Sequence, residues 1–493
     1  MIITVPGRRA PGVDRPSLWS PAVLRTEVLA GLVVGLALIP EAIAFSVIAG
    51  VDPRVGLFSS VTMAITIAFA GGRPAMVSAA TAAVALVVAP MAREHGVGYL
   101  VATIALAGII QMLLAFFGVA KLMRFIPRSV MVGFVNALAI LVFVAQLRHL
   151  IDVPWLVYPL TAIGIVLMVL LPKVTTAVPA PLVVVLVLTL AVVAFGWHVP
   201  NVGDQGALPD SLPVLGMPQV PLTLHTLQII GPYALGAALV GLLESLMTAK
   251  LVDDITDTRS NKTREAWGQG MANVVTAAFG GMGGCAVVGQ TMMNVKIAGA
   301  RTRLSTLLTG VFVLILVLAL GDLVGRIPMA ALVAVMIVVS VATFDWHSVA
   351  PQTLKMLPRS ETLVMVITVV ATVATGNLAI GVSLGVLAAM VAFARRVAHC
   401  TSVSAVEPGA YRVRGDLFFV SSNDLVHQFD YAGDPAEVVI DLSGTAVWDA
   451  SSVATLDAIR LKYSSRGKTV QFIGLDDASS ARLNRMSGRL GAT

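Results

Sequence analysis

Two glutamates stand alone inside long apolar stretches of the chain. Glu41 follows Pro40 in LALIPEAIAFS, and Glu244 lies 203 residues later in ALVGLLESLMTAK, with Thr248 one helical turn beyond it. A carboxyl at the centre of a bilayer is costly, so it marks a functional position by default. Because burial disfavours the charged form of a carboxyl, each glutamate can take up and release a proton. Glu244 and Thr248 share one helical face and offer adjacent oxygens to a proton or a sodium ion.

Each glutamate also has a structural explanation. The Glu41 carboxyl can bond a backbone group freed by Pro40, because proline removes one helical hydrogen bond. The Glu244 carboxyl can form a hydrogen bond that packs two helices together. The sequence favours a role in ion coupling and leaves these explanations open.

Two segments are too short and too rich in small residues to be ordinary membrane spans. They are VSAATAAVALVVAP from Val77 and AVVGQTMMNVKIAG from Ala286. Half-helix N-termini that face each other at the membrane midplane present free N–H groups and positive dipole ends, which attract an anion. Close helix packing explains either segment alone, and the pairing of the two favours a binding site. The predicted anion-binding residues are Ser78, Ala79, Ala80 and Thr81 in the first segment, and Gly289, Gln290 and Thr291 in the second.

The composition indicates the elements that must hold these residues. Of the 493 residues, 57% are hydrophobic and 12% are charged, against about 25% charged in soluble domains. This composition argues against a soluble globular protein and excludes a disordered chain. Apolar runs matched to a bilayer predict up to fourteen helices, centred near Leu36, Ala64, Leu86, Ile109, Ala139, Val166, Leu188, Val240, Val275, Met292, Val313, Val335, Val369 and Leu387.

The basic residues of the apolar part gather on one side of the membrane. Residues 1–396 hold 24 Lys and Arg against 16 Asp and Glu, whereas residues 397–493 hold 9 against 11. With the N-terminus inside and fourteen crossings, 20 of the 24 lie inside, and only Arg54, Arg93, Arg148 and Arg326 lie outside. This positive-inside bias predicts that both termini are cytoplasmic. The net charge of +6 therefore records topology and gives no support for a nucleic-acid partner.

The spacing of the features predicts an internal repeat. If the fourteen helices form two inverted halves of seven, the first and eighth helices are equivalent, and so are the third and tenth. Thr81 lies 40 residues after Glu41, and Thr291 lies 47 residues after Glu244. We expect a cytoplasmic segment at 1–22, a fourteen-helix transporter domain at 23–397 and a soluble domain at 398–493. No removable signal peptide is expected, so the first helix should stay in the mature protein.

The tail after Arg396 changes to short β-type runs that alternate with helical stretches. Strands are predicted at YRVRG from Tyr411, FFV from Phe418, EVVIDL from Glu437 and TVQFIG from Thr469, with a helix from Val453. About 90 residues are enough for a small α/β domain with its own core.

The residues from Val240 to Ser305 resemble the sulfate permease (SulP) family, also called solute carrier family 26. IPEAIAFS from Ile39 and SAATAA from Ser78 resemble two further motifs of that family, except that Glu41 replaces the usual glutamine, and Ala79 with Ala80 replaces a Gly-Pro pair. The resemblance implies a fourteen-helix core and gate architecture, with the anion between the third and tenth half-helices and an elevator-like movement of the core. It also implies a homodimer, and it implies that sodium-coupled members place their cation ligands at Glu244 and Thr248.

The tail resembles the STAS domain of the same family through VVIDLSGTAVWDASSVATLDAI from Val438. In bacterial anti-sigma-factor antagonists that it resembles, a phosphorylated serine follows the aspartate that here is Asp449, and Ala450 takes its place. A scaffold or regulatory contact is therefore expected instead of a phospho-switch. Ser451 and Ser452 are expected to cap a helix.

The leading functional hypothesis is a secondary transporter of a small anion in a bacterial inner membrane. We expect symport of a dicarboxylate such as fumarate with a proton bound by Glu41 or Glu244. The same-class alternative is sodium-coupled transport of bicarbonate or sulfate, and an anion channel or a sensor that signals through the STAS domain is the alternative of another class. No catalytic cluster, cofactor or metal site is expected, apart from the possible sodium at Glu244 and Thr248; Cys285 and Cys400 give no disulfide framework or zinc ligand set.

Overall fold

A computed structural model describes residues 20–118, 126–174, 179–205, 215–216, 220–221, 223–319, 321–398, 401–422 and 425–488. Most of the predicted segment 1–22, part of the loop from Trp197 to Thr226, and Cys400 lie outside these ranges. The chain divides into two compact units, Met1–Val386 and Leu387–Thr493, which we describe separately.

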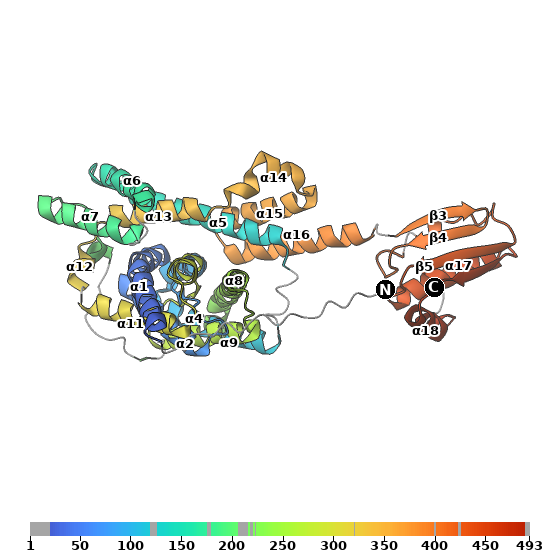
Figure 1. The fold of residues 1–493 in the computed structure, drawn as a ribbon, viewed down its shortest axis with the longest axis horizontal. Helices are drawn as coiled ribbons and strands as arrows, with labels where there is room; N and C mark the ends of the chain where they lie inside the picture. The colour runs from blue at the N-terminus through green and yellow to red at the C-terminus, as the bar shows by residue number, and fades with distance from the viewer. Residues whose placement is uncertain are drawn as a thin grey trace. The chain divides into compact units, whose positions relative to one another are not determined.

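The first unit is helical (Figure 1), and its last helix, α16, continues along the chain past the unit boundary at Val386. Each of the fourteen predicted centres lies in a helix, and the short α12 and α14 were not predicted. By length and composition, seven of the described helices can cross a membrane: α1, α2, α4, α5 with the 3-10 turn after it, α6, α8 and α16. The helices are α1 (Pro21–Ala49), α2 (Pro53–Ala70), α3 (Ala82–His95), α4 (Val97–Phe116), α5 (Arg128–Leu147), α6 (Val157–Val174), α7 (Ala180–Phe195), α8 (Leu224–Thr256), α9 (Lys262–Ala278), α10 (Val288–Met292), α11 (Arg303–Ala319), α12 (Gly321–Gly325), α13 (Met329–Thr343), α14 (Pro351–Met356), α15 (Arg359–Thr375) and α16 (Leu378–Ala398).

The helices of this unit form two groups. Helices α1, α2, α3, α4, α8, α9 and α11 pack mainly on one another, and α5, α6, α7, α13 and α15 pack mainly on one another. Figure 1 shows α5, α6, α7 and α13 in one layer and α1, α2, α8, α9 and α11 in another. Glycine allows α4 and α9 to pack closely, because a Cβ on Gly108 of α4 would lie 2.5 Å from the carbonyl oxygen of Gly270 on α9.

Ionic and polar bonds fix the segment that leads from α2 toward the predicted anion site. The buried Glu265 carboxylate accepts hydrogen bonds from the backbone N–H groups of Gly72 at 2.7 Å and Arg73 at 2.9 Å. The Arg73 guanidinium forms an ion pair with Asp253 at 3.0 Å. Arg303 donates to the carbonyl oxygen of Ala68 at the end of α2. Because burial keeps water from competing, these charge-assisted bonds hold the segment to α8, α9 and α11.

The second unit is a small α/β domain. Its sheet has the order β3 (Ser402–Glu407), β4 (Ala410–Arg414), β5 (Glu437–Gly444) and β6 (Thr469–Ile473), with an antiparallel β3–β4 pair and parallel pairs after it. Helices α17 (Ala450–Ser464) and α18 (Asp477–Met486) complete it. Its core includes Val413, Ile440, Leu456 and Ile459. The strands predicted from Tyr411, Glu437 and Thr469 and the helix near Val453 are confirmed.

Three details of this domain differ from the prediction. The strand predicted at Phe418 is wrong, because Ser421 and Asp449 take its backbone N–H groups into a turn: Phe418 N bonds Ser421 Oγ at 3.2 Å, and Phe419 N bonds Asp449 Oδ2 at 2.6 Å. Strand β3 was not predicted. The N-cap of α17 is Asp449, whose carboxylate accepts from Ser452 N at 2.9 Å and Ser452 Oγ at 2.8 Å, so Ser451 and Ser452 do not cap the helix.

Candidate functional site

Helices α3 and α10, which overlap the two predicted anion-binding segments, both start from a small antiparallel ribbon. Strand β1 (Ser78–Ala79) pairs with β2 (Cys285–Ala286), with Ser78 opposite Ala286 and Ala79 opposite Cys285. Residue 284 must be glycine for this approach, because a Cβ there would lie 1.9 Å from the Ala79 carbonyl oxygen. Since the strands are antiparallel, α3 and α10 leave the ribbon in opposite directions and their N-termini lie at its two ends. The structure thus brings together the two segments that the sequence paired.

The four predicted residues at the α3 end are all buried, and three of them form the hydrogen bonds given below. Ser78 Oγ accepts from Gln269 Nε2 at 2.7 Å, and Ala80 N donates to Ser60 Oγ at 3.3 Å. Thr81 is the N-cap of α3 and accepts from Val84 N at 3.5 Å. The α3 terminus is therefore a fixed element with a hydroxyl at its tip.

The predicted residues of the α10 end have three different surroundings. Gly289 is exposed, and no atom lies within 4 Å of where its Cβ would be. Gln290 is 2% exposed, and its Oε1 has no hydrogen-bond partner among the described residues. Thr291 turns to the neighbouring segment, where its hydroxyl oxygen accepts from Val77 N at 3.1 Å. Gly289 leaves the first turn of α10 open to a ligand, whereas Thr291 holds the ribbon together.

Glu41 lies in the middle of α1, which packs against the α10 end. It is 7% exposed, and its carboxyl lies near the side-chain amide of Gln290. The sequence did not predict this contact, which joins a candidate coupling carboxyl to a candidate anion-site residue. Pro40, just before it, removes one helical N–H.

Glu244 lies on α8 beside the α3 end. Its Oε2 accepts a hydrogen bond from the thiol of Cys285 at 2.9 Å, and Cys285 Sγ lies 3.2 Å from Thr81 Oγ1. The Thr248 hydroxyl donates to the backbone carbonyl of Glu244 at 2.8 Å, not to its carboxylate. The structure therefore brings Glu244 to Thr81 through a cysteine, and Thr248 is bonded within its own helix.

The sequence analysis missed several residues that build this site. Cys285 lies in β2, directly before the predicted tenth segment, and that position was its only signal. Asn273 on α9 bonds both backbone groups of Gly284, accepting from its N at 2.9 Å and donating to its O at 3.1 Å. Gln269, one turn earlier, bonds Ser78. Both α9 amides are polar residues in a segment that the sequence predicted to cross the membrane, which is the signal that could have found them.

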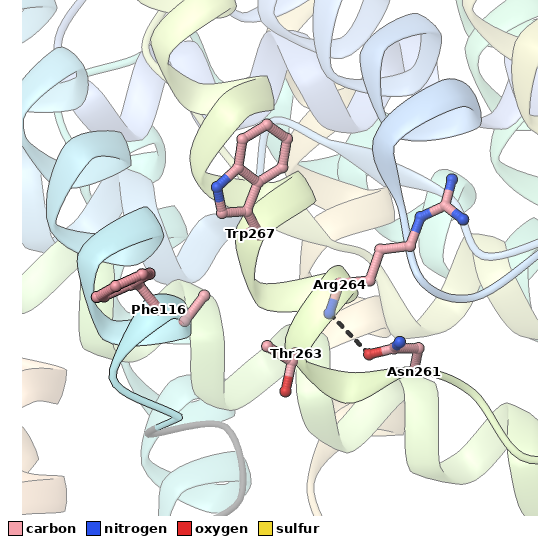
Figure 2. Close-up of a pocket in the computed structure, with 6 residues that line it drawn as sticks. Phe116, Asn261, Thr263, Arg264 and Trp267 are labelled. Carbon is pink, nitrogen blue, oxygen red and sulfur yellow. Dashed lines mark hydrogen bonds between the residues drawn. The ribbon is translucent and has the colours of Figure 1, made fainter.

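A separate hollow lies between the end of α4 and the start of α9 (Figure 2). Phe116 and Trp267 line it, and Arg264 extends away from both rings in Figure 2. The Arg264 guanidinium donates to the carbonyl oxygens of Phe69 and Ala70 at 3.0 and 3.2 Å. Because the Arg264 guanidinium is bonded to the end of α2, we assign no anion site to this hollow.

Two family models match the chain. The sulfate permease family matches residues 24–163 and 152–368, and the STAS domain matches residues 403–487. Together they cover both units of the structure.

Relatives with assigned names match over most of their length. "Putative sulfate transporter YbaR" of Bacillus subtilis is 49% identical over 94% of this chain and 97% of its own. "Bicarbonate transporter BicA" of Picosynechococcus is 26% identical over 67% of this chain and 64% of its own.

Solved structures share the fold. Murine Slc26a9, an anion transporter in the inward-facing state, is 17% identical with a TM-score of 0.81 over 94% of this chain and 88% of its own. The transmembrane domain of a cyanobacterial bicarbonate transporter, BicA, is 22% identical with a TM-score of 0.66 over 73% of this chain and 98% of its own.

Proposed function

Because the chain belongs to the sulfate permease family of membrane transporters, we propose that it is a secondary active transporter that carries a small divalent anion together with a proton. A dicarboxylate such as fumarate is the first substrate to test. The protein is a multi-pass membrane transporter and not an enzyme.

The observation that carries this proposal is the contact between Glu41 and Gln290. It places a buried carboxyl directly against the half-helix whose open first turn contains Gly289. An anion bound at that turn and an ionised Glu41 would repel each other in a region of low dielectric constant. Protonation of Glu41 removes the repulsion, so proton and anion binding favour each other.

The Gln290 amide suits both forms of Glu41. Its NH₂ group can donate to an ionised carboxylate, and its unpartnered Oε1 can accept from a protonated carboxyl after the amide rotates. A divalent anion gains most from this arrangement, because the proton offsets one of its charges. This reasoning favours a dicarboxylate or sulfate over chloride.

Sulfate and bicarbonate are the second candidate substrates, with sodium as the coupling ion. The names of the relatives favour them. Glu244 would then be the cation ligand. Thr248 could contribute a lone pair, since its hydroxyl proton is already donated to the helix backbone.

The proposed architecture follows the two packing groups. Fourteen helices would form two inverted halves of seven along the chain. Of the two packing groups, the one with α1, α3 and α8 would be the core that carries the site, and the other would be the gate. The antiparallel β1–β2 ribbon and the opposite directions of α3 and α10 support this arrangement. The core would shift like an elevator against the gate in a homodimer, with both termini in the cytoplasm.

Transport by purified protein in proteoliposomes tests the proposal. Radiolabelled fumarate, sulfate and bicarbonate are offered under an imposed pH gradient without sodium, and under a sodium gradient without a pH gradient. Accumulation of a divalent anion with the pH gradient alone supports the proposal. Strict dependence on sodium contradicts it, and binding without flux identifies a sensor.

A further inference from the structure

Three side chains from three elements form a short polar chain beside the α3 N-terminus. Glu244 comes from α8, Cys285 from β2 and Thr81 from the start of α3. The thiol lies 2.9 Å from Glu244 Oε2 and 3.2 Å from Thr81 Oγ1. Cys285 is 0% exposed and Thr81 is 2% exposed, so both side chains are shielded from water, whereas Glu244 is half-buried.

The backbone of Cys285 is held on both sides. Ala286 N, after it, donates to Ser245 Oγ at 3.0 Å, and Gly284, before it, is bonded twice by Asn273. Cys285 itself pairs with Ala79 in the ribbon. Its side chain is therefore placed independently of its own hydrogen bonds, and a substitution of similar size need not move the strand.

The directions of the two bonds follow from the number of protons. An ionised carboxylate can only accept, so the single thiol proton is donated to Glu244. Sγ can then only accept from Thr81, whose hydroxyl proton points to the sulfur. Thr81 Oγ1 also accepts from Val84 N at 3.5 Å. With Glu244 ionised, Thr81 therefore has no proton to offer an anion at the α3 terminus.

We propose that Cys285 is a positioning residue that transmits the occupancy of Glu244 by a cation to the hydroxyl of Thr81. This inference rests on the proposed function, in which an anion binds at the two half-helix ends. It adds a second link between cation and anion, separate from the contact of Glu41 with Gln290.

Cation binding at Glu244 reverses the order of donors. When a proton or a sodium ion occupies Oε2 itself, that oxygen no longer accepts from the thiol, and rotation about Cβ–Sγ turns S–H toward Thr81 Oγ1. The Thr81 hydroxyl then turns its own proton toward the anion. The thiol and hydroxyl protons stay on their own atoms, so only the added cation changes the composition of the site. Anion binding becomes stronger because it gains a hydrogen-bond donor.

Few other ionisable groups can imitate this effect when pH is varied. Among the described residues, Cys285 is the titratable group that contacts Glu244. The ionisable residues of the helices packed against α8 lie near helix ends: Arg93, Glu94 and His95 on α3, Tyr99 on α4, and Lys262, Arg264 and Glu265 on α9. Glu41 contributes a separate pH dependence, so the comparison is made in an E41Q background.

The first test measures how much a cation strengthens anion binding. Binding of radiolabelled fumarate and sulfate to the purified full chain is measured at acidic and alkaline pH without sodium, and with and without sodium at alkaline pH. We expect the effective cation to lower Kd by about ten-fold in the E41Q parent, within the range usual for coupled sites. Adding C285A should reduce this ratio to less than about two-fold, and C285S, which keeps a donor and an acceptor, should restore it.

A matched variant separates this role from support of the fold. S245A removes the other bond between α8 and β2 without touching the three-residue chain. It should change anion affinity equally with and without the cation, so the ratio should stay at the parent value. A ratio that falls in S245A as far as in C285A overturns the positioning role.

The second test needs no change at Cys285. In a C400S protein, Cys285 is the remaining thiol, and its S–H stretching band in the infrared reports the strength of the bond it donates. Adding the effective cation should shift this band to higher frequency, and E244Q should abolish the shift. A band that does not move while anion affinity rises overturns the proposal.

The outcomes also separate this inference from the proposed function. If the cation strengthens anion binding equally in C285A and in its parent, the role of Cys285 fails and coupled transport stands. If neither cation strengthens anion binding in the unmodified chain and no gradient drives uptake, both fail.

Discussion

Replacing Glu41 with glutamine should uncouple anion uptake from the pH gradient. In the structure, Glu41 is 7% exposed and faces the Gln290 amide, whose Oε1 has no partner among the described residues. A glutamine at position 41 has the shape of a protonated glutamate, and its NH₂ can donate to that Oε1. The variant should therefore fold and bind the anion, but it can neither accept nor release a proton.

The size of the effect follows from the proton it no longer carries. If one proton accompanies each anion, each pH unit across the membrane supplies about 1.4 kcal/mol, which corresponds to about ten-fold accumulation. The wild type should reach about that ratio per pH unit, and E41Q should only equilibrate the anion. Counterflow of labelled against unlabelled anion, which needs no net proton movement, should persist in E41Q.

The assay compares wild type, E41Q and E361Q in the same proteoliposomes. Glu361 lies in the first turn of α15 and has no assigned role in coupling, so E361Q controls for the loss of one carboxylate. Accumulation by E41Q that follows the pH gradient as in wild type would refute the assignment of Glu41 as the coupling group. Loss of counterflow together with accumulation would show that Glu41 supports the site itself.

Three further predictions concern stability. In the segment 398–493 produced alone, D449A should lower the free energy of unfolding by about 1–2 kcal/mol, because the N-cap of α17 and the bond to Phe419 N are lost together. Urea titration followed by Trp448 fluorescence measures this change, and an unchanged midpoint contradicts the prediction. The same titration should show that the free energy of unfolding falls as pH rises above about 10. Burial, and after it the Asp434 carboxylate that accepts from Tyr463 at 2.6 Å, raise the pKa of Tyr463 in the folded domain, so this tyrosine ionises first in the unfolded chain. A free energy of unfolding that stays level to pH 11 contradicts the prediction. In the full chain, E27A should lower the free energy of unfolding by about 2–4 kcal/mol, because the buried carboxylate accepts from three backbone N–H groups at the start of α11. Thermal melting in detergent should show a smaller loss of stability for E27Q than for E27A.

Sequence patterns located the helices well because each membrane helix is a continuous run of mostly apolar residues. Each of the fourteen predicted centres lies in a helix, and the two short segments are short in the structure. Patterns failed where side chains decide the backbone. Ser421 and Asp449 convert the apolar run at Phe418 into a turn, and no periodicity of the run itself contains that information.

The sequence named candidate residues of the site but not the bonds that these residues form. Thr291 is a predicted anion-binding residue, and its hydroxyl oxygen accepts from Val77 N in the structure. Thr248 is predicted to offer an oxygen beside the Glu244 carboxyl, and its hydroxyl donates to the backbone carbonyl of that residue. Both are hydroxyls in helices, where a nearby backbone group competes with any ligand.

The sequence by itself indicated a membrane protein with two isolated carboxyls in apolar stretches and two short segments, because hydrophobicity and charge act residue by residue, and its motifs indicated the transporter family. The tertiary structure alone decided that Glu41 meets Gln290 and that Glu244 reaches Thr81 through Cys285. These partners are far apart along the chain, and they meet because the ribbon of β1 and β2 brings the two halves of the domain together at one point.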